Sequence, residues 1–174
     1  MSKEAYMLKI IAVFTAIFYS LTAAAGECRL INNSGQLNFD DIRIGNLKRQ
    51  MLMGKSYAVL KKSVSLSANC DNVSNFSVYY QAKNDGKAYN LDQGNGLYVF
   101  SIRNFILNGS ERQPKYQDSN QHASQLLPGK EVSVDNIQTG NQNISMSLDV
   151  ELFIDPTQSD NNISSSGEFV IHSY

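Results

Sequence analysis

Apolar and polar residues alternate with a period of two in several segments of the chain, as they do in β-strands that bury one face. In residues 59–70, Val64, Leu66 and Ala68 fall on one side of the expected strand, and serines fall on the other. Residues 144–154 alternate in the same way over a longer stretch. This pattern predicts a mostly β protein.

Turn signals separate these segments at the spacing expected of a β-sandwich. Asn84-Asp85-Gly86 predicts a hairpin turn, because glycine tolerates the positive φ that such turns need. Residues 108–124 are polar and rich in turn formers, and residues 48–57 suit an irregular connection. Further strands are expected at residues 28–31, 36–44, 76–82, 88–91, 97–107, 132–134 and 168–174.

The last expected strand has apolar residues on both of its faces. Period two places Phe169 and Ile171 on one face, which we expect to face the core. The other face carries Val170, His172 and Tyr174. A strand with two partly apolar faces suits a position beside an added strand.

The first 25 residues predict a secretory signal peptide. Lysines precede an apolar run in residues 10–19, and small residues follow at 23–25, which is the order of a cleavable signal. Cleavage then leaves one domain, residues 26–174. An uncleaved anchor helix is the alternative, although the apolar run is shorter than the about 20 residues that a spanning helix needs.

Export bears on the two cysteines, Cys28 and Cys70, because an oxidising compartment favours their pairing. Cys70 is in phase with Val64, Leu66 and Ala68, so its sulfur is expected to face the core. We expect a Cys28–Cys70 disulfide with Cα atoms about 5.5–6 Å apart.

Composition and motifs give little support for catalysis or for a cofactor. The formal net charge is −1 and the sequence contains no basic block, so a nucleic-acid partner is not expected. His122 and His172 are not accompanied by a nucleophile elbow, and the loop at residues 92–96 lacks most carboxylates of a calcium loop. We expect a protein that is not an enzyme and holds neither metal nor cofactor.

Taken together, these features resemble the fimbrial subunits of bacterial chaperone–usher systems, the type 1 pilins. A related group of uncharacterised pilin-like periplasmic proteins fits about as well. The resemblance lies in a signal peptide followed by a cysteine on the first strand, in the segment Leu37-Asn38-Phe39 with Ile42-Arg43-Ile44-Gly45, in Cys70 at the end of an alternating strand, and in the alternating end Phe169-Val170-Ile171-His172-Ser173-Tyr174.

The resemblance implies an immunoglobulin-like sandwich that lacks its last strand. It implies a groove beside the C-terminal strand, lined by Phe169, Val170, Ile171 and Tyr174, which a periplasmic chaperone fills first and a neighbouring subunit fills later, with an outer-membrane usher as third partner. This is strand addition, in which main-chain hydrogen bonds supply affinity.

The chain departs from the family at both ends. Only Gly26 and Glu27 precede Cys28 after cleavage, so no donor extension is expected, which places the subunit at a fibre end. The penultimate residue is Ser173, where the family has an aromatic residue.

These features predict a structural or adhesive fimbrial subunit, exported through the periplasm to the cell surface, with any host receptor unidentified. The alternative is a free-standing periplasmic or secreted binding domain that is not assembled.

Overall fold

The computed structural model describes residues 26–32, 37, 43–52, 54–135, 137–157 and 163–174. The expected signal peptide and most of the strand expected at residues 36–44 lie outside these described residues. Nearly all regular structure in the described part is β, and it forms two antiparallel sheets. The alternation in the sequence therefore predicts the fold class correctly.

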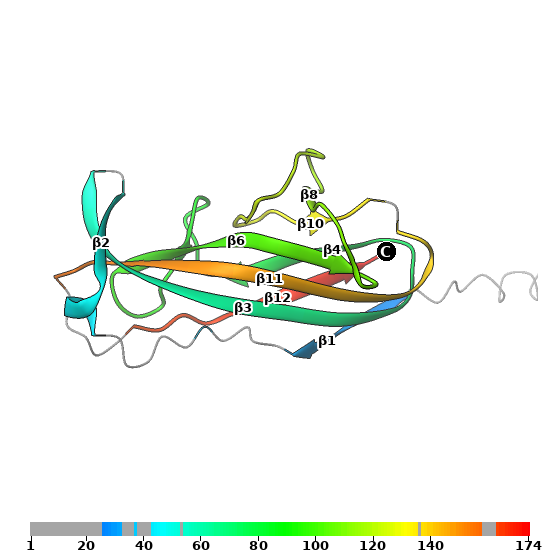
Figure 1. Ribbon diagram of the computed structural model, residues 1–174, viewed down its shortest axis with the longest axis horizontal. Helices are drawn as coiled ribbons and strands as arrows, with labels where there is room; N and C mark the ends of the chain where they lie inside the picture. Colours follow the sequence, from blue (N-terminus) through cyan, green and yellow to red (C-terminus); the bar gives the residue numbers. More distant parts are fainter. Residues whose placement is uncertain (1–25, 33–36, 38–42, 53, 136, 158–162) are drawn as a thin grey trace, which may run out of the picture.

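The larger sheet has eight strands, and its main path runs in the order β1-β3-β11-β6-β5. Strands β3, β11 and β6 run side by side along the length of the molecule (Figure 1). Strand β2 pairs with β3, and β7 and β9 pair with β6. The strands of this sheet are β1 (Glu27–Asn32), β2 (Lys48–Leu52), β3 (Lys55–Val73), β5 (Tyr89–Asn90), β6 (Gly96–Leu107), β7 (Ser110–Glu111), β9 (Gln125–Leu126) and β11 (Gly140–Ile154).

The smaller sheet packs behind the larger one and has the order β12-β4-β10-β8 (Figure 1). Its long members are β4 and β12, which pair antiparallel over their whole length. Strand β12 stands at the edge, with β4 as its one paired neighbour among the described residues. The bounds are β4 (Phe76–Ala82), β8 (Lys115–Tyr116), β10 (Val132–Ser133) and β12 (Gly167–Ser173).

The order of the six main strands is that of an immunoglobulin domain without its last strand. That domain has strands A, B, E and D in one sheet and C, F and G in the other, lettered in chain order. Lettered in the same way, β1, β3, β4, β6, β11 and β12 become A to F, so the larger sheet reads A-B-E-D and the smaller contains F beside C. No described strand takes the place of G, which is the position beyond the free edge of β12.

The core lies between the two sheets and is formed by the alternating apolar faces. In β11 the inward residues are all buried: Ile144, Met146, Leu148, Val150 and Leu152. One end of the core is aromatic, because five rings meet with centroid separations from 4.7 to 6.4 Å. These are the rings of Tyr80, Tyr89, Tyr98, Phe100 and Phe169.

The disulfide between Cys28 and Cys70 is present, and Cys70 is fully buried as its phase predicts. The expected Cα separation is wrong, since the two Cα atoms are 3.9 Å apart. The reason is that Cys28 and Cys70 face each other directly in the ladder of β1 and β3, and directly opposed residues in the narrow pairs of antiparallel strands lie closest.

Two local expectations from the sequence are also wrong. Residues 48–57 are not irregular, because β2 and the start of β3 form a regular hairpin around Gly54, whose φ is +79°. Ile44 is not the end of a strand but begins a short 3-10 helix, η1 (Ile44–Asn46). The expected turn after β4 is present, because Asn84 and Tyr89 form an antiparallel bridge and Asn90 N–H donates to Lys83 O at 2.8 Å. Strand β5 also pairs with β6, where Tyr89 stacks against Tyr98.

Candidate functional site

The candidate site is the free edge of β12, which contains the residues predicted from the sequence. Phe169 is 2% exposed and packs on Tyr80 and Phe100, while Ile171 is half-buried against the core. Tyr174 is 53% exposed. The predicted orientation is confirmed for the core-facing residues Phe169 and Ile171.

The pairing of β12 with β4 determines which main-chain groups point away from the sheet. Tyr174 N–H donates to Asn75 O at 3.0 Å, and Asn75 N–H donates to Tyr174 O at 3.3 Å, so these two residues form a hydrogen-bonded pair. Such pairs alternate along an antiparallel ladder, so the main-chain groups of His172 and Val170 also face β4. The N–H and C=O groups of Phe169, Ile171 and Ser173 therefore point outward.

An edge of this kind is a template for another strand, because each outward N–H and C=O group is an unpaired donor or acceptor. No described strand pairs with this edge. One polar contact reaches its end, where Ser173 Oγ donates to Gly26 O at 2.7 Å. This contact links the start of β1 with the end of β12 and leaves the middle of the edge, at Phe169 and Ile171, without a described partner strand.

The outer face of β12 is held by Glu131, which the sequence did not single out. Glu131 lies just before β10 and accepts a hydrogen bond from the buried Ser77 hydroxyl of β4. His172 Nδ1 lies 3.2 Å from Glu131 Oε1, and the Tyr174 hydroxyl lies 3.3 Å from Oε2. The His172 ring also packs on Tyr79, with centroids 5.0 Å apart. The contacts of Glu131 with Ser77 and His172 join three segments that are distant in the sequence, so they could be recognised only once the order of the strands in the sheet was known.

This arrangement does not form a catalytic relay of the Ser-His-Asp type. In such a relay the histidine lies between the nucleophile and the carboxylate, whereas here Glu131 lies between Ser77 and His172. His122 is on a different segment and contacts Pro114 O at 3.1 Å. In the described part of the chain, no group of three or more histidine, cysteine or carboxylate side chains is placed to hold a metal ion.

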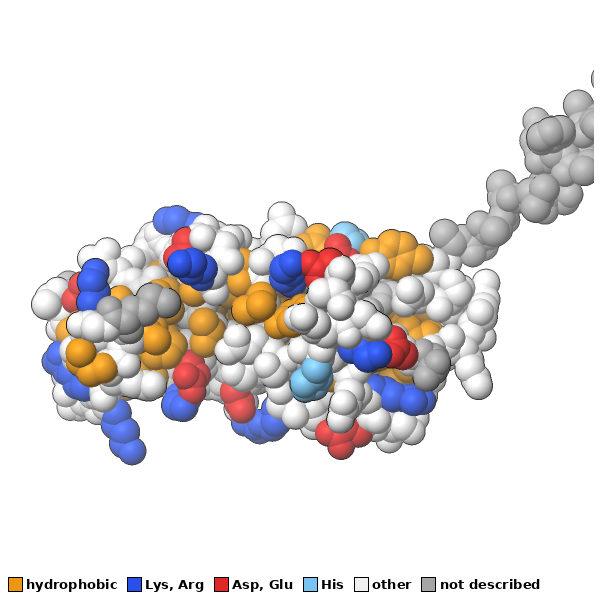
Figure 2. Space-filling model, turned by 90° about the horizontal axis from the view of Figure 1, so that it is seen from above, with side chains coloured by type: hydrophobic (Ala, Val, Ile, Leu, Met, Phe, Trp, Pro, Cys, Tyr) orange, Lys and Arg blue, Asp and Glu red, His pale blue; other side chains and the backbone are white. Residues whose placement is uncertain are grey.

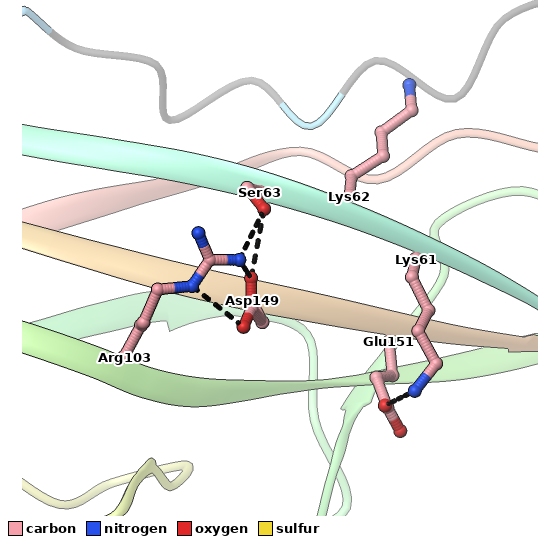
Figure 3. A pocket seen from close by; sticks show the side chains of 6 residues that line it. All are labelled: Lys61, Lys62, Ser63, Arg103, Asp149 and Glu151. Atoms are coloured by element: carbon pink, nitrogen blue, oxygen red, sulfur yellow. Dashed lines mark hydrogen bonds and ion pairs between the residues drawn. The ribbon is translucent and has the colours of Figure 1, made fainter.

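A second polar feature lies on the exposed face of the larger sheet, in a hollow of about 260 Å³ (Figure 3). Strand β6 has a bulge here, because Ile102 and Asn104 pair with consecutive residues of β11 and Arg103 is the extra residue. Arg103 Nε donates to Asp149 Oδ2 at 3.1 Å, and its Nη2 donates to Ser63 Oγ at 3.0 Å.

Four of the five charged groups that line this hollow form ion pairs with one another. The Arg103 guanidinium, followed by the Ser63 hydroxyl, lowers the pKa of Asp149 below its usual value. Lys61 of β3 forms an ion pair with Glu151 of β11. Each of these side chains already has a partner on a neighbouring strand, so the hollow is best explained as an ion-pair network between strands.

Comparisons with known proteins add no assignment to this geometry. In the part of the chain that the structure describes, no helix has the length and apolar character needed to cross a membrane. No family model matches the chain, and no curated protein and no solved structure is significantly similar to it.

Proposed function

We propose that the protein is a non-enzymatic structural or adhesive subunit of a surface fimbria, which accepts a strand from a partner at the free edge of β12. The partners are a periplasmic chaperone during transit, an outer-membrane usher during export, and a neighbouring subunit in the fibre. The protein passes through the periplasm and ends on the cell surface.

One observation carries the proposal: the strand order is that of an immunoglobulin domain, and the position of strand G is empty among the described strands. The outward N–H and C=O groups of Phe169, Ile171 and Ser173 lie at that position. An added strand would pair with them, and each hydrogen bond contributes a net of about 0.5–1.5 kcal/mol. Strand addition of this kind obtains its affinity from the main chain.

A second function is supported by the core beneath β12, which the chain covers with its own residues. Phe169 is almost fully buried without any partner chain, and Leu37, which follows β1, is buried in the same core. A domain that covers its own core does not need a donated strand to remain soluble. This observation supports the alternative of a free-standing periplasmic or secreted binding domain.

A photo-crosslinking experiment separates the two functions. Tyr174 is replaced by p-benzoylphenylalanine, which preserves an aromatic group at an exposed position beside the edge of β12. The matched control carries the same residue at Gln117, which is exposed on the segment between β8 and β10. Both proteins are expressed in cells that assemble the fimbria, and crosslinked products are identified by mass spectrometry.

The fimbrial proposal predicts one product with the chaperone in the periplasm and one with a neighbouring subunit in isolated fibres, both specific to position 174. A protein that stays monomeric and gives no product at position 174 contradicts the proposal and favours the free-standing domain. Equal products at positions 174 and 117 also contradict it, because they indicate contact without use of the β12 edge.

A further inference from the structure

Positive charge is unevenly distributed along this nearly neutral chain. Residues 42–70 hold six of the fifteen lysine and arginine residues and contain no aspartate or glutamate, although the formal net charge of the whole chain is −1. Such asymmetry within one domain indicates an electrostatic surface rather than a general property of the composition.

The fold brings most of this charge to one end of the molecule. Strand β2 and the start of β3 form a hairpin that stands across the end opposite the C-terminus (Figure 1). Several lysine and arginine side chains are visible at that end in the space-filling view, and others are spread along the rest of the visible face (Figure 2). Four exposed cations belong to this end, and we call them the basic hairpin: Arg43, Lys48, Arg49 and Lys55.

Four cations elsewhere on the surface are ion-paired, whereas those of the basic hairpin, like Lys83, Lys87 and Arg112, have no ion pair with a described carboxylate. Lys61, Arg103, Lys115 and Lys130 each form an ion pair with a carboxylate. Among the described residues, no carboxylate lies within ion-pair distance of any member of the basic hairpin. Lys55 does act on Asp155, whose pKa is lowered mainly by hydrogen bonds with Thr157 and also by the positive charge of Lys55.

We propose that the basic hairpin is a binding surface for an anionic polysaccharide, with sulfate or carboxylate groups as the recognised chemistry. Period two and the pairing register place Lys48 and Lys55 on one face of the hairpin and Arg49 on the other, so both faces present positive charge to a polymer with repeating anionic groups. Gln50 adds a neutral hydrogen-bonding group on the face of Lys48, and Ser56 adds one on the face of Arg49. The biological setting of this inference, a surface adhesin, rests on the proposed function.

Two other polyanions fit the hairpin less well. A membrane surface needs an apolar face beside the cations, and Met51 is the one large apolar side chain of the described hairpin residues that is mostly exposed, at 65%. Single-stranded nucleic acid needs aromatic rings free to stack on bases, whereas Tyr57 is half-buried and packs edge-on against Phe153.

The test measures binding of the purified protein to heparin, as a soluble sulfated polysaccharide, by calorimetry at several salt concentrations. Lys48→Gln/Arg49→Gln removes two cations of the basic hairpin. Its matched control, Lys87→Gln/Arg112→Gln, removes a lysine and an arginine that are also exposed and lie elsewhere on the surface. The crosslinking assay at position 174 is run on both variants, so that failure of this inference is distinguished from failure of strand acceptance.

The hairpin variant is expected to bind heparin about tenfold more weakly, with a salt dependence smaller by about two ions. The control variant should bind like the parent, and both should keep their crosslinks and their thermal midpoints. The inference is overturned if the parent does not bind heparin or if the two variants lose affinity equally. It is also overturned if duplex DNA or phosphatidylglycerol vesicles bind the parent as tightly as heparin does.

Discussion

At the scale of single residues, the aromatic end of the core contains hydroxyl groups in two different states. The Ser165 hydroxyl donates to Tyr98 Oη at 2.6 Å, and both residues belong to the buried interior. Tyr89 is also buried, but its hydroxyl has no partner among the described residues. A buried polar atom without a hydrogen bond lowers stability, whereas a paired one contributes to it.

This difference predicts opposite effects of the same chemical change. Tyr89→Phe should raise the free energy of unfolding by about 1 kcal/mol, because it removes a buried hydroxyl that is unpaired. Tyr98→Phe should lower it by about 1–2 kcal/mol, because the buried Ser165 hydroxyl then loses its acceptor. Urea unfolding of the two variants tests the pair, and a similar loss of stability in both would mean that Tyr89 has a partner after all.

The face of a strand on which each residue lies could be predicted from the sequence, but contacts between residues of different strands could not. Alternation alone placed Cys70 and Phe169 in the core, since period two requires only the neighbours along the same strand. Glu131 was missed because it lies in a polar segment, and its contacts with Ser77 and His172 depend on β10, β4 and β12 being adjacent in the sheet.

At the scale of elements, strand β1 depends strongly on its disulfide. It is a short strand whose one paired neighbour among the described strands is β3, and Cys28 and Leu30 pack against the core only in part. The bond to Cys70 closes a loop with a sequence separation of 42. This loop contains β2 and η1, so the disulfide limits the freedom of that whole region in the unfolded chain.

We therefore expect Cys28→Ala/Cys70→Ala to lower the free energy of unfolding by about 3–4 kcal/mol, as the loop-entropy model predicts for a loop of this length. That is a large share of the about 5–15 kcal/mol typical of a domain. The measurement is the urea midpoint of the double variant against the oxidised parent. A change below about 1 kcal/mol would show that this loop already has restricted freedom in the unfolded chain without the disulfide.

The element that sequence reasoning misjudged most is the hairpin of β2 and β3. Its residues lack clean alternation because the cations Lys48 and Arg49 occupy consecutive positions, one on each face. Both faces are exposed at this end of the molecule, so burial imposes no period on the sequence. Strand β5 pairs back across the turn before it, as expected, and its second pairing, with β6, could not be predicted because it depends on Tyr89 stacking against Tyr98.

At the scale of the whole molecule, the fold class could be predicted from strand patterns and turn spacing, because an all-β chain of this length has few ways to bury alternating faces. The sheet order required the structure. It places β12 at an edge of the smaller sheet, and no described strand occupies the position of strand G beside it. This placement gives the sequence resemblance a mechanism, strand addition at β12, that can be tested.

The buried tyrosines also predict how the whole fold responds to alkali. Burial is the main cause that raises the pKa of Tyr80, Tyr89 and Tyr98 above the usual value of about 10. In the unfolded chain these groups lose protons near pH 10 while the folded protein still holds them, so stability is complete below that pH and falls as pH rises further.

Thermal unfolding monitored between pH 8 and pH 12 should therefore show a falling midpoint above about pH 10. The fall should be less steep in Tyr89→Phe, which removes one of the buried groups. An equally steep fall in that variant would assign the alkaline loss to other titrating groups, such as surface lysines.

The central claim is that the outward edge of β12 is open in the isolated protein and is used by a partner strand. Amide hydrogen exchange measured by NMR tests it directly, because alternate residues of one strand serve as internal controls. In the isolated protein, the amides of Val170 and His172 should exchange slowly, since they face β4, and those of Phe169 and Ile171 should exchange much faster. In the partner-bound protein, all four should be slow. Slow exchange at Phe169 and Ile171 in the isolated protein would contradict the account, because the edge would then already be paired within the chain.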